Sequence, residues 1–301
     1  MKKIALLLIL VLLATGALLG CGRERANEPN PSNGEQQGKA EDNSVDFSKM
    51  IQVRGSDTMV NLGQQWAETF MDEYPEAMIA VTGGGSGTGI AAIINGTADI
   101  AQSSRAMKDS ELEQAKANGF DLKEIVAGRD GIVVAVHKDN PIEALTLAQV
   151  KDIFTGTVTN WKELGGNDAA ITLYSRESNS GTYAFFKEFV LKDEEYAKEA
   201  LLMPSTGAIM EGLKQDANGI GYIGLGYLTD EVKAVPVATE DGAEAFLPSL
   251  ETINSGDYPV ARPLYLYTAG EPEGVIKLYV DFILGKPGQD IVLDLGFIPL
   301  D

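Results

Sequence analysis

Apolar residues along the chain follow two alternating periods, which predict strands and helices in turn from about residue 47 onward. The helix after residue 58 carries Met59, Leu62, Trp66 and Phe70 at three- and four-residue spacing on one face. Further helices are expected around 91–95 and at 111–117, 146–154, 182–190 and 275–284. Short apolar runs predict strands at 50–53, 78–81, 98–101, 124–127, 132–136, 171–174, 219–223 and 264–268. This alternation is typical of an α/β protein.

The run 132–136 is continuously apolar, which indicates a strand that is buried on both faces or crosses between two domains. The folded part starts near residue 47 and has about 255 residues, enough for two modest domains or one large one.

The N-terminal residues 1–20 have the pattern of an export signal. Lys2 and Lys3 precede an apolar run of about 16 residues that ends at Gly20-Cys21, which is short for a membrane-spanning helix. Residues 18–21 resemble a bacterial lipobox, so Cys21 is predicted to carry lipid and to anchor the protein at the extracytoplasmic face of the cell membrane. The alternative is a plain secretory signal with a chance cysteine. Cys21 is the only cysteine, which excludes an intramolecular disulfide.

Residues 21–46 combine the predicted lipidated cysteine with a polar segment that has almost nothing to bury, and they are expected to form a flexible tether. The chain has a net charge of −20, and loss of Lys2 and Lys3 with the signal takes it to −22. This argues against a nucleic-acid partner, which requires a basic patch. Any bound anion must therefore be held by local dipoles and one or two placed cations.

Three short loops of glycine and hydroxyl residues each run into a predicted helix. The first turn of a helix leaves backbone N–H groups unpaired and carries partial positive charge, so a small oxyanion can bind there. Arg176 lies four residues before Ser180 and offers a planar fork of donors that suits a tetrahedral oxyanion. Each loop alone could be ordinary N-capping, but the three together favour a site that surrounds an anion. The loops are Gly55-Ser56-Asp57-Thr58, Gly83-Gly84-Gly85-Ser86-Gly87-Thr88 and Arg176-Glu177-Ser178-Asn179-Ser180-Gly181-Thr182.

The spacing of the candidate catalytic and cofactor-binding residues gives little support for an enzyme. Residues 87–92 match a loose dinucleotide pattern, but no acidic residue stands at the end of a following strand to bind a ribose. Ser86 lacks a nucleophile elbow because position 88 is threonine. His137 is the only histidine and is expected in a turn, and no acidic cluster has metal-ligand spacing. We therefore expect a protein that is not an enzyme and needs neither metal nor cofactor.

The same residues resemble a known family, the phosphate-binding lipoproteins of bacterial phosphate ABC importers in their Gram-positive-like form. The resemblance covers essentially the whole mature chain. It is carried by Gly55-Ser56-Asp57-Thr58-Met59, Gly84-Gly85-Ser86-Gly87-Thr88-Gly89, Ser103-Ser104-Arg105, the loop 176–182, Asp152-Ile153-Phe154-Thr155-Gly156 with Asn160-Trp161, and Gly296-Phe297-Ile298-Pro299-Leu300.

The resemblance implies a class II periplasmic-binding-protein fold, in which two α/β lobes joined by two hinge crossings close on a ligand. The first lobe is predicted at 47–130 plus 260–301 and the second at 131–259. The implied function is extracytoplasmic capture of inorganic phosphate and its delivery to a membrane-embedded ABC permease. The implied phosphate-binding residues are Thr58, Met59 through its N–H, Ser86, Ser104, Arg176, Ser180, Gly181 and Thr182, with Ser56, Asp57, Gly87 and Arg105 as a wider set.

The chain departs from one version of the family pattern. There, an aspartate after the third strand accepts a hydrogen bond from protonated phosphate, whereas Ser104 stands at that place here. This leaves the rejection of sulfate open, with Asp57 as a substitute acceptor. The alternatives are a receptor for sulfate or molybdate, and a surface adhesion or signalling protein on the same fold. A phosphatase is less favoured because neither a metal cluster nor a nucleophile with its base is present.

Overall fold

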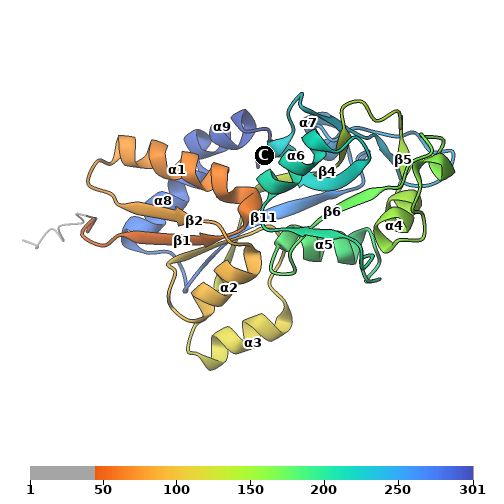
Figure 1. The fold of residues 1–301 in the computed structure, drawn as a ribbon. Helices are drawn as coiled ribbons and strands as arrows, with labels where there is room; N and C mark the ends of the chain where they lie inside the picture. The colour runs from red at the N-terminus through yellow and green to blue at the C-terminus, as the bar shows by residue number, and fades with distance from the viewer. Residues whose placement is uncertain (1–44, 301) are drawn as a thin grey trace, which may run out of the picture. The chain divides into compact units, whose positions relative to one another are not determined.

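A nine-stranded mixed sheet runs through residues 45–300, the part of the chain that the computed structural model describes (Figure 1). The predicted signal peptide, Cys21 and nearly all of the tether lie outside these residues. The strand order is β2 (Ile79–Thr82), β1 (Ile51–Gly55), β3 (Ile100–Ser103), β11 (Ala261–Thr268), β4 (Lys123–His137), β8 (Gly219–Gly224), β6 (Thr172–Arg176) and β7 (Leu201–Met203), with β9 (Val232–Ala234) paired to the end of β4. A separate pair joins β5 (Leu145–Thr146) to β10 (Val237–Ala238).

Strand β4 is shared by the two halves of this sheet. Its first part pairs antiparallel with β11, and its second part pairs antiparallel with β8 and β9. The sequence predicted two strands here, at 124–127 and 132–136, and that separation is wrong. The intervening residues 128–131 stay extended because residues 261–264 of β11 pair with them. The apolar end of β4 is buried on both faces, as predicted, since Ile132 and Val134 pack into one core and Val133 and Ala135 into another.

Helices cover both faces of the half that contains β1. On one face α1 (Val60–Glu73), α8 (Gly274–Leu284) and α9 (Lys286–Asp294) share a core in which Trp66 and Phe70 of α1 pack with Tyr279 of α8 and Ile291 of α9. The Trp66 indole N–H also donates to the Gly288 carbonyl at 2.8 Å. On the other face lie α2 (Ser86–Ile94) and α3 (Asp109–Ala117), whose apolar residues pack around Tyr267 of β11.

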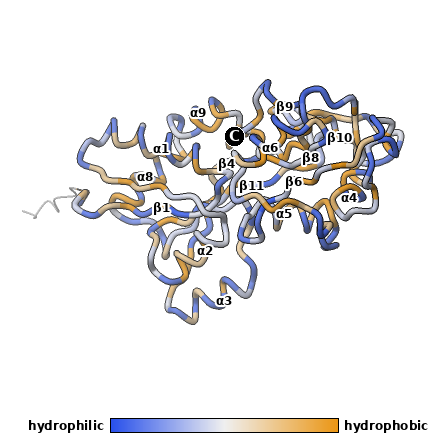
Figure 2. The backbone as a smooth tube through the Cα atoms, viewed as in Figure 1, coloured by the Kyte–Doolittle hydropathy of each residue, from blue (hydrophilic) through white to orange (hydrophobic). Residues whose placement is uncertain are grey.

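The half that contains β6 and β8 is layered in the same way. Phe154 of α4 (Leu147–Thr155) and Phe186 of α5 (Gly181–Phe189) pack with Tyr222 of β8, while Ile209 of α6 (Thr206–Gln215) packs on the opposite face. Figure 2 shows apolar segments concentrated in the strands and the helices that pack on them. Helices α6, α7 (Leu250–Ser255) and α9 were not predicted, nor were the short 3₁₀ turns η1 (Asp57–Met59), η2 (Trp161–Leu164) and η3 (Leu225–Tyr227).

No helix within residues 45–300 is both long enough and apolar enough to cross a membrane.

Candidate oxyanion site

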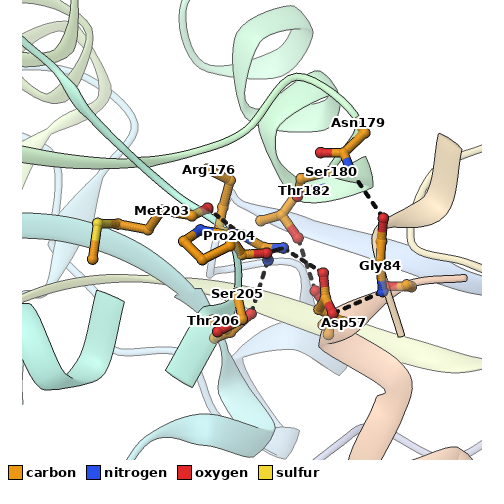
Figure 3. A network of polar contacts seen from close by, with 12 residues as sticks. Asp57, Gly84, Arg176, Asn179, Ser180, Thr182, Met203, Pro204, Ser205 and Thr206 are labelled. Carbon is orange, nitrogen blue, oxygen red and sulfur yellow. Dashed lines mark hydrogen bonds and ion pairs between the residues drawn. The ribbon is translucent and has the colours of Figure 1, made fainter. Parts of the chain in front are cut away.

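The three hydroxyl-rich loops each lead into a helix, as predicted, and they meet at one place (Figure 3). The first loop joins β1 to η1 and α1, the second joins β2 to α2, and the third joins β6 to α5. The hydroxyl oxygens of Thr58 and Thr182 lie 2.8 Å apart and connect the first loop to the third. Asn179 joins the third loop to the second, because its side-chain amide donates to the Gly84 carbonyl and its own carbonyl accepts from the Gly87 N–H, each at 2.9 Å.

Three serines from separate segments form a buried hydroxyl cluster, which we define as Ser56, Ser86 and Ser104. Each is exposed by 2 % or less. The Ser56 hydroxyl donates to Ser104 Oγ at 2.9 Å, and the Ser104 N–H donates to Ser86 Oγ at 3.0 Å. A serine hydroxyl carries one donor and can rotate, so this cluster can redirect its O–H bonds towards an anion.

The N-terminus of α5 lies directly against the hydroxyl cluster. A Cβ atom added at Gly181 would lie 2.2 Å from Ser86 Oγ and 2.7 Å from Ser104 Oγ, so no other residue fits this approach. Ser180 caps the helix, because its Oγ accepts from the N–H groups of Thr182 and Tyr183 at 3.2 and 3.3 Å. The helix start therefore brings partial positive charge to buried hydroxyls that come from the other half of the sheet.

Arg176 is also buried here, but most of its donors already have partners in the protein (Figure 3). Its Nη2 donates to Asp57 Oδ2 at 2.6 Å and to the Pro204 carbonyl at 3.1 Å, and its Nη1 donates to Thr206 Oγ1 at 3.0 Å. The other oxygen of Asp57 accepts from the Gly84 N–H at 3.0 Å. The pair of Arg176 and Asp57 thus joins the first loop to the third across the site.

A second buried ion pair, Arg262 with Asp130, was not predicted from the sequence. Arg262 Nη2 lies 2.9 Å from Asp130 Oδ2, and both residues are exposed by 2 % or less. Arg262 Nη2 also donates to Thr182 Oγ1 at 2.9 Å and to Thr58 Oγ1 at 3.4 Å. Burial raises the pKa of Asp130, and the Arg262 guanidinium and the Leu225 N–H counteract that rise.

The sequence carries only a faint signal for this second pair. Asp130 and Arg262 are charged residues beside apolar runs, in 132–136 and 264–268. Nothing in the sequence shows that they are direct partners across the β4–β11 ladder. A charged residue that interrupts a predicted buried strand is the one sign that could have drawn attention to them.

Other predicted residues lie at the border of the site or turn away from it. The Arg105 guanidinium is paired with Glu111 at 2.7 Å. The Met59 side chain is fully buried in the core around α1, and its N–H donates to the Ser56 carbonyl at 3.1 Å. His137 is the last residue of β4, and its Nδ1 accepts from the Asp139 N–H in a turn. Within residues 45–300 no group of three or more metal-ligating side chains is assembled.

Comparison with known proteins places this architecture among binding proteins. A family model described as a PBP superfamily domain matches residues 28–287. The phosphate-binding protein PstS of Pseudomonas aeruginosa is 35 % identical over 263 residues, which cover 82 % of this chain and 81 % of that protein. The phosphate-binding protein PstS of Bacillus subtilis is 34 % identical over 301 residues, with 100 % and 95 % covered.

Solved structures give the same picture. The crystal structure of a putative phosphate ABC transporter substrate-binding protein from Clostridium perfringens, with bound phosphate, matches with a TM-score of 0.76 and 38 % identity, covering 84 % of this chain and all of that one. An ABC-type phosphate transport receptor from Vibrio cholerae matches with a TM-score of 0.68 and 27 % identity, with 83 % and 100 % covered.

Proposed function

The chain belongs to the PstS family of phosphate-binding proteins within the PBP superfamily, and we propose that it captures inorganic phosphate outside the cytoplasmic membrane for an ABC-type phosphate importer. The predicted α/β class II binding-protein fold is confirmed by this membership and by the solved relatives. The relatives are solute-binding proteins rather than enzymes, and this chain is proposed to act in the same way, without metal or cofactor.

One observation carries the proposal: buried, neutral donors from three loops converge where α5 begins. Ser86 and Ser104 face Gly181, and Thr58 faces Thr182 at 2.8 Å. A tetrahedral oxyanion has lone pairs in all directions and is best satisfied by donors that surround it. Hydroxyls and helix N–H groups provide such donors without adding net charge.

The charges in the site support a mechanism based on dipoles. Each buried arginine is paired with an aspartate, Arg176 with Asp57 and Arg262 with Asp130. The two pairs are neutral overall, so the proposed site does not rely on an excess of positive charge. In a chain with net charge −20, local dipoles and single N–H bonds must hold the anion against an unfavourable general field.

The proposed ligand contacts come from both predicted lobes, residues 47–130 plus 260–301 and residues 131–259. Thr58, Ser86 and Ser104 belong to the first, whereas Arg176, Ser180, Gly181 and Thr182 belong to the second. Phosphate bound between them makes more contacts in the closed arrangement than in an open one, and this difference drives closure. The closed form is the one that we propose the permease recognises.

Attachment to the membrane is proposed from sequence alone. Cys21 follows an apolar run and Gly20, and the tether to residue 46 lets the folded part reach a permease from a lipid anchor.

A titration panel tests the proposed ligand. Isothermal calorimetry with phosphate, arsenate, sulfate and molybdate on the purified mature protein should show tight binding of phosphate and its close analogue arsenate. Tighter binding of sulfate or molybdate would replace phosphate with another oxyanion, and no heat with any of the four would refute the oxyanion site.

A pair of matched threonine variants links the binding to this site. Thr182→Val keeps the side-chain shape and removes a buried hydroxyl, which is worth about 1.5–3 kcal/mol when it bonds a charged group. Phosphate binding should weaken about 10- to 150-fold. Thr157→Val removes an exposed hydroxyl of the same half and should bind as the parent does. Equal affinities in the two variants would place the anion elsewhere.

A further inference from the structure

Arg262 is a buried cation with a free donor atom beside the proposed ligand hydroxyls. Within residues 45–300 its Nη1 has no hydrogen-bond partner, although the side chain is 2 % exposed. We propose that Arg262 donates a hydrogen bond from Nη1 directly to the bound oxyanion, and that Asp130 positions it. This rests on the proposed function, and it adds Arg262 to the residues that contact the ligand.

The planar guanidinium determines where the free donor points. Nε and Nη2 both donate to Asp130 Oδ2, at 3.3 and 2.9 Å, so this edge of the group is occupied. The second N–H of Nη2 must then lie on the opposite, end-on edge, where it reaches Thr182 and Thr58. In a guanidinium the outward N–H of Nη1 runs parallel to that bond. Nη1 is therefore aimed to the same side as the two threonine hydroxyls.

Arg176 differs from Arg262 in how its donors are used. Its Nε, Nη1 and Nη2 make four hydrogen bonds to protein atoms, with Met203, Pro204, Thr206 and Asp57 as acceptors. An anion would have to compete with these partners. Arg262 has both N–H bonds of Nη1 available, and a buried donor without an acceptor is unfavourable by itself. An oxyanion that accepts from Nη1 removes that penalty.

The position of Arg262 is held by its surroundings. Asp130 and Arg262 are direct partners in the β4–β11 ladder, and the Leu225 N–H donates to Asp130 Oδ1 at 3.0 Å. The guanidinium carbon lies 5.5 Å from the centre of the Phe185 ring in α5. A fork that is fixed in this way loses little side-chain freedom on binding, which favours affinity.

Arg262 also lies where an anion can approach. It lines a groove of about 980 Å³ between α5 and residues 105–109. Four other cations line this groove together with three acidic residues: Arg105, Lys108, Lys187 and Lys192, with Asp109, Glu188 and Asp193. Three of the five cations are paired with acidic residues, Arg105 with Glu111, Lys187 with Glu195 and Arg262 with Asp130, so the groove is a path to Arg262 without an excess of positive charge.

Calorimetry on a charge-balanced variant tests the proposal. Arg262→Met alone leaves Asp130 buried without a partner and could unfold the protein. The double variant Arg262→Met, Asp130→Asn removes both charges, and its amide oxygen can still accept from the Leu225 N–H. We expect a cooperative thermal transition and phosphate binding weakened by roughly 30-fold or more. Arg262→Lys, which keeps the charge but not the fork, should also lose affinity, by about tenfold.

Arg129→Met is the matched control. Arg129 precedes Asp130 on β4, but its guanidinium turns to the Asn254 side chain, so its loss should leave phosphate affinity unchanged. If the double variant binds phosphate within about threefold of the parent, Arg262 is only the structural partner of Asp130 and the proposal is overturned. If the parent protein itself binds no oxyanion, both the proposed function and the role of Arg262 fail. Failure of the Arg262 proposal alone is recognised by a parent that binds phosphate and a double variant that binds it equally well.

A crystal structure of the parent protein with phosphate gives a test that does not depend on how a variant folds. We expect Arg262 Nη1 within about 3.2 Å of a phosphate oxygen. A phosphate held by Arg176 and the hydroxyl loops, with Arg262 Nη1 more than about 4 Å from every ligand oxygen, would overturn the inference.

Discussion

Replacing Gly181 by alanine should weaken phosphate binding while leaving the second half of the molecule folded. The added Cβ would lie 2.2 Å from Ser86 Oγ and 2.9 Å from Ser86 Cβ. Rotation of the Ser86 hydroxyl relieves the contact with Oγ but not the contact with Ser86 Cβ. The added Cβ would also lie 2.7 Å from Ser104 Oγ, so it cannot shift towards Ser104. The start of α5 must therefore move away from the hydroxyl cluster by roughly 1 Å to reach van der Waals contact.

A displacement of this size determines how much phosphate affinity is lost. Hydrogen bonds weaken steeply beyond about 3.2 Å, so an anion that bridges Ser86 and the helix start would lose at least one bond. A hydrogen bond to a charged group is worth about 1.5–3 kcal/mol, which corresponds to a 10- to 150-fold loss of affinity. The substitution also improves helix propensity by up to about 1 kcal/mol, which offsets part of the cost of about 1–3 kcal/mol for overpacking a buried contact, so thermal stability should fall only modestly. A cooperative thermal transition together with the loss of binding separates this effect from misfolding.

Gly207→Ala is the matched control for calorimetry and thermal unfolding. Gly207 lies in the first turn of α6, where an added Cβ would approach only Ser205 Oγ, at 3.9 Å. Its replacement should give the same gain in helix propensity and an unchanged phosphate affinity. If Gly181→Ala binds phosphate as tightly as Gly207→Ala does, the close approach of α5 to the serines plays no part in binding, and the reasoning is refuted.

Three further outcomes follow from the same contacts. Arg176→Ala leaves the Asp57 carboxylate without its cation beside the proposed anion, and this uncompensated negative charge, about 2 kcal/mol or more, should weaken phosphate binding roughly 30-fold or more by calorimetry; an unchanged affinity would contradict this. Small-angle scattering should show a smaller radius of gyration when phosphate is added, and an identical profile at saturation would argue for a rigid protein. Cys21→Ser should release the protein from membranes or block its processing, and a variant that fractionates with membranes as the parent does would rule out the lipid anchor.

Sequence periodicity predicted the fold well where each element has its own local signal. The helix with Trp66 and Phe70 shows a clear 3.6-residue pattern, and α1 occupies that place. Helix α6 was missed because Gly207 and Gly212 interrupt a short apolar pattern, although Ser205 accepts from the Ala208 N–H as its N-cap. The division of β4 was wrong because tertiary pairing with β11, invisible in a local window, keeps residues 128–131 extended.

The candidate site likewise contains residues with a local sequence signal and residues without one. Residues in glycine and hydroxyl loops were found because a loop before a helix is a local pattern, and the structure brings Ser86, Ser104 and Gly181 together. Their role in binding stays a prediction. Arg262 and Asp130 were missed because they become partners only when β4 and β11 pair, and the two residues are 132 positions apart in the chain. A single charged residue has no periodicity from which such a partner could be inferred.

The pairing of β4 with β11 also determines the order in which the molecule can fold. Gly131 and Ala261 are partners in the ladder, so the segment between them begins and ends at one point and supplies every buried residue of its core except Ile298. Strand β3, by contrast, has β11 as its neighbour, and the core around Trp66 needs α8 and α9. As the chain emerges from its N-terminal end, the first half of the sheet therefore has an open edge and an uncovered apolar face until residues after 260 follow. The part of the fold that is made first is the last to be finished, and a chain that stops before residue 261 leaves it exposed to aggregation.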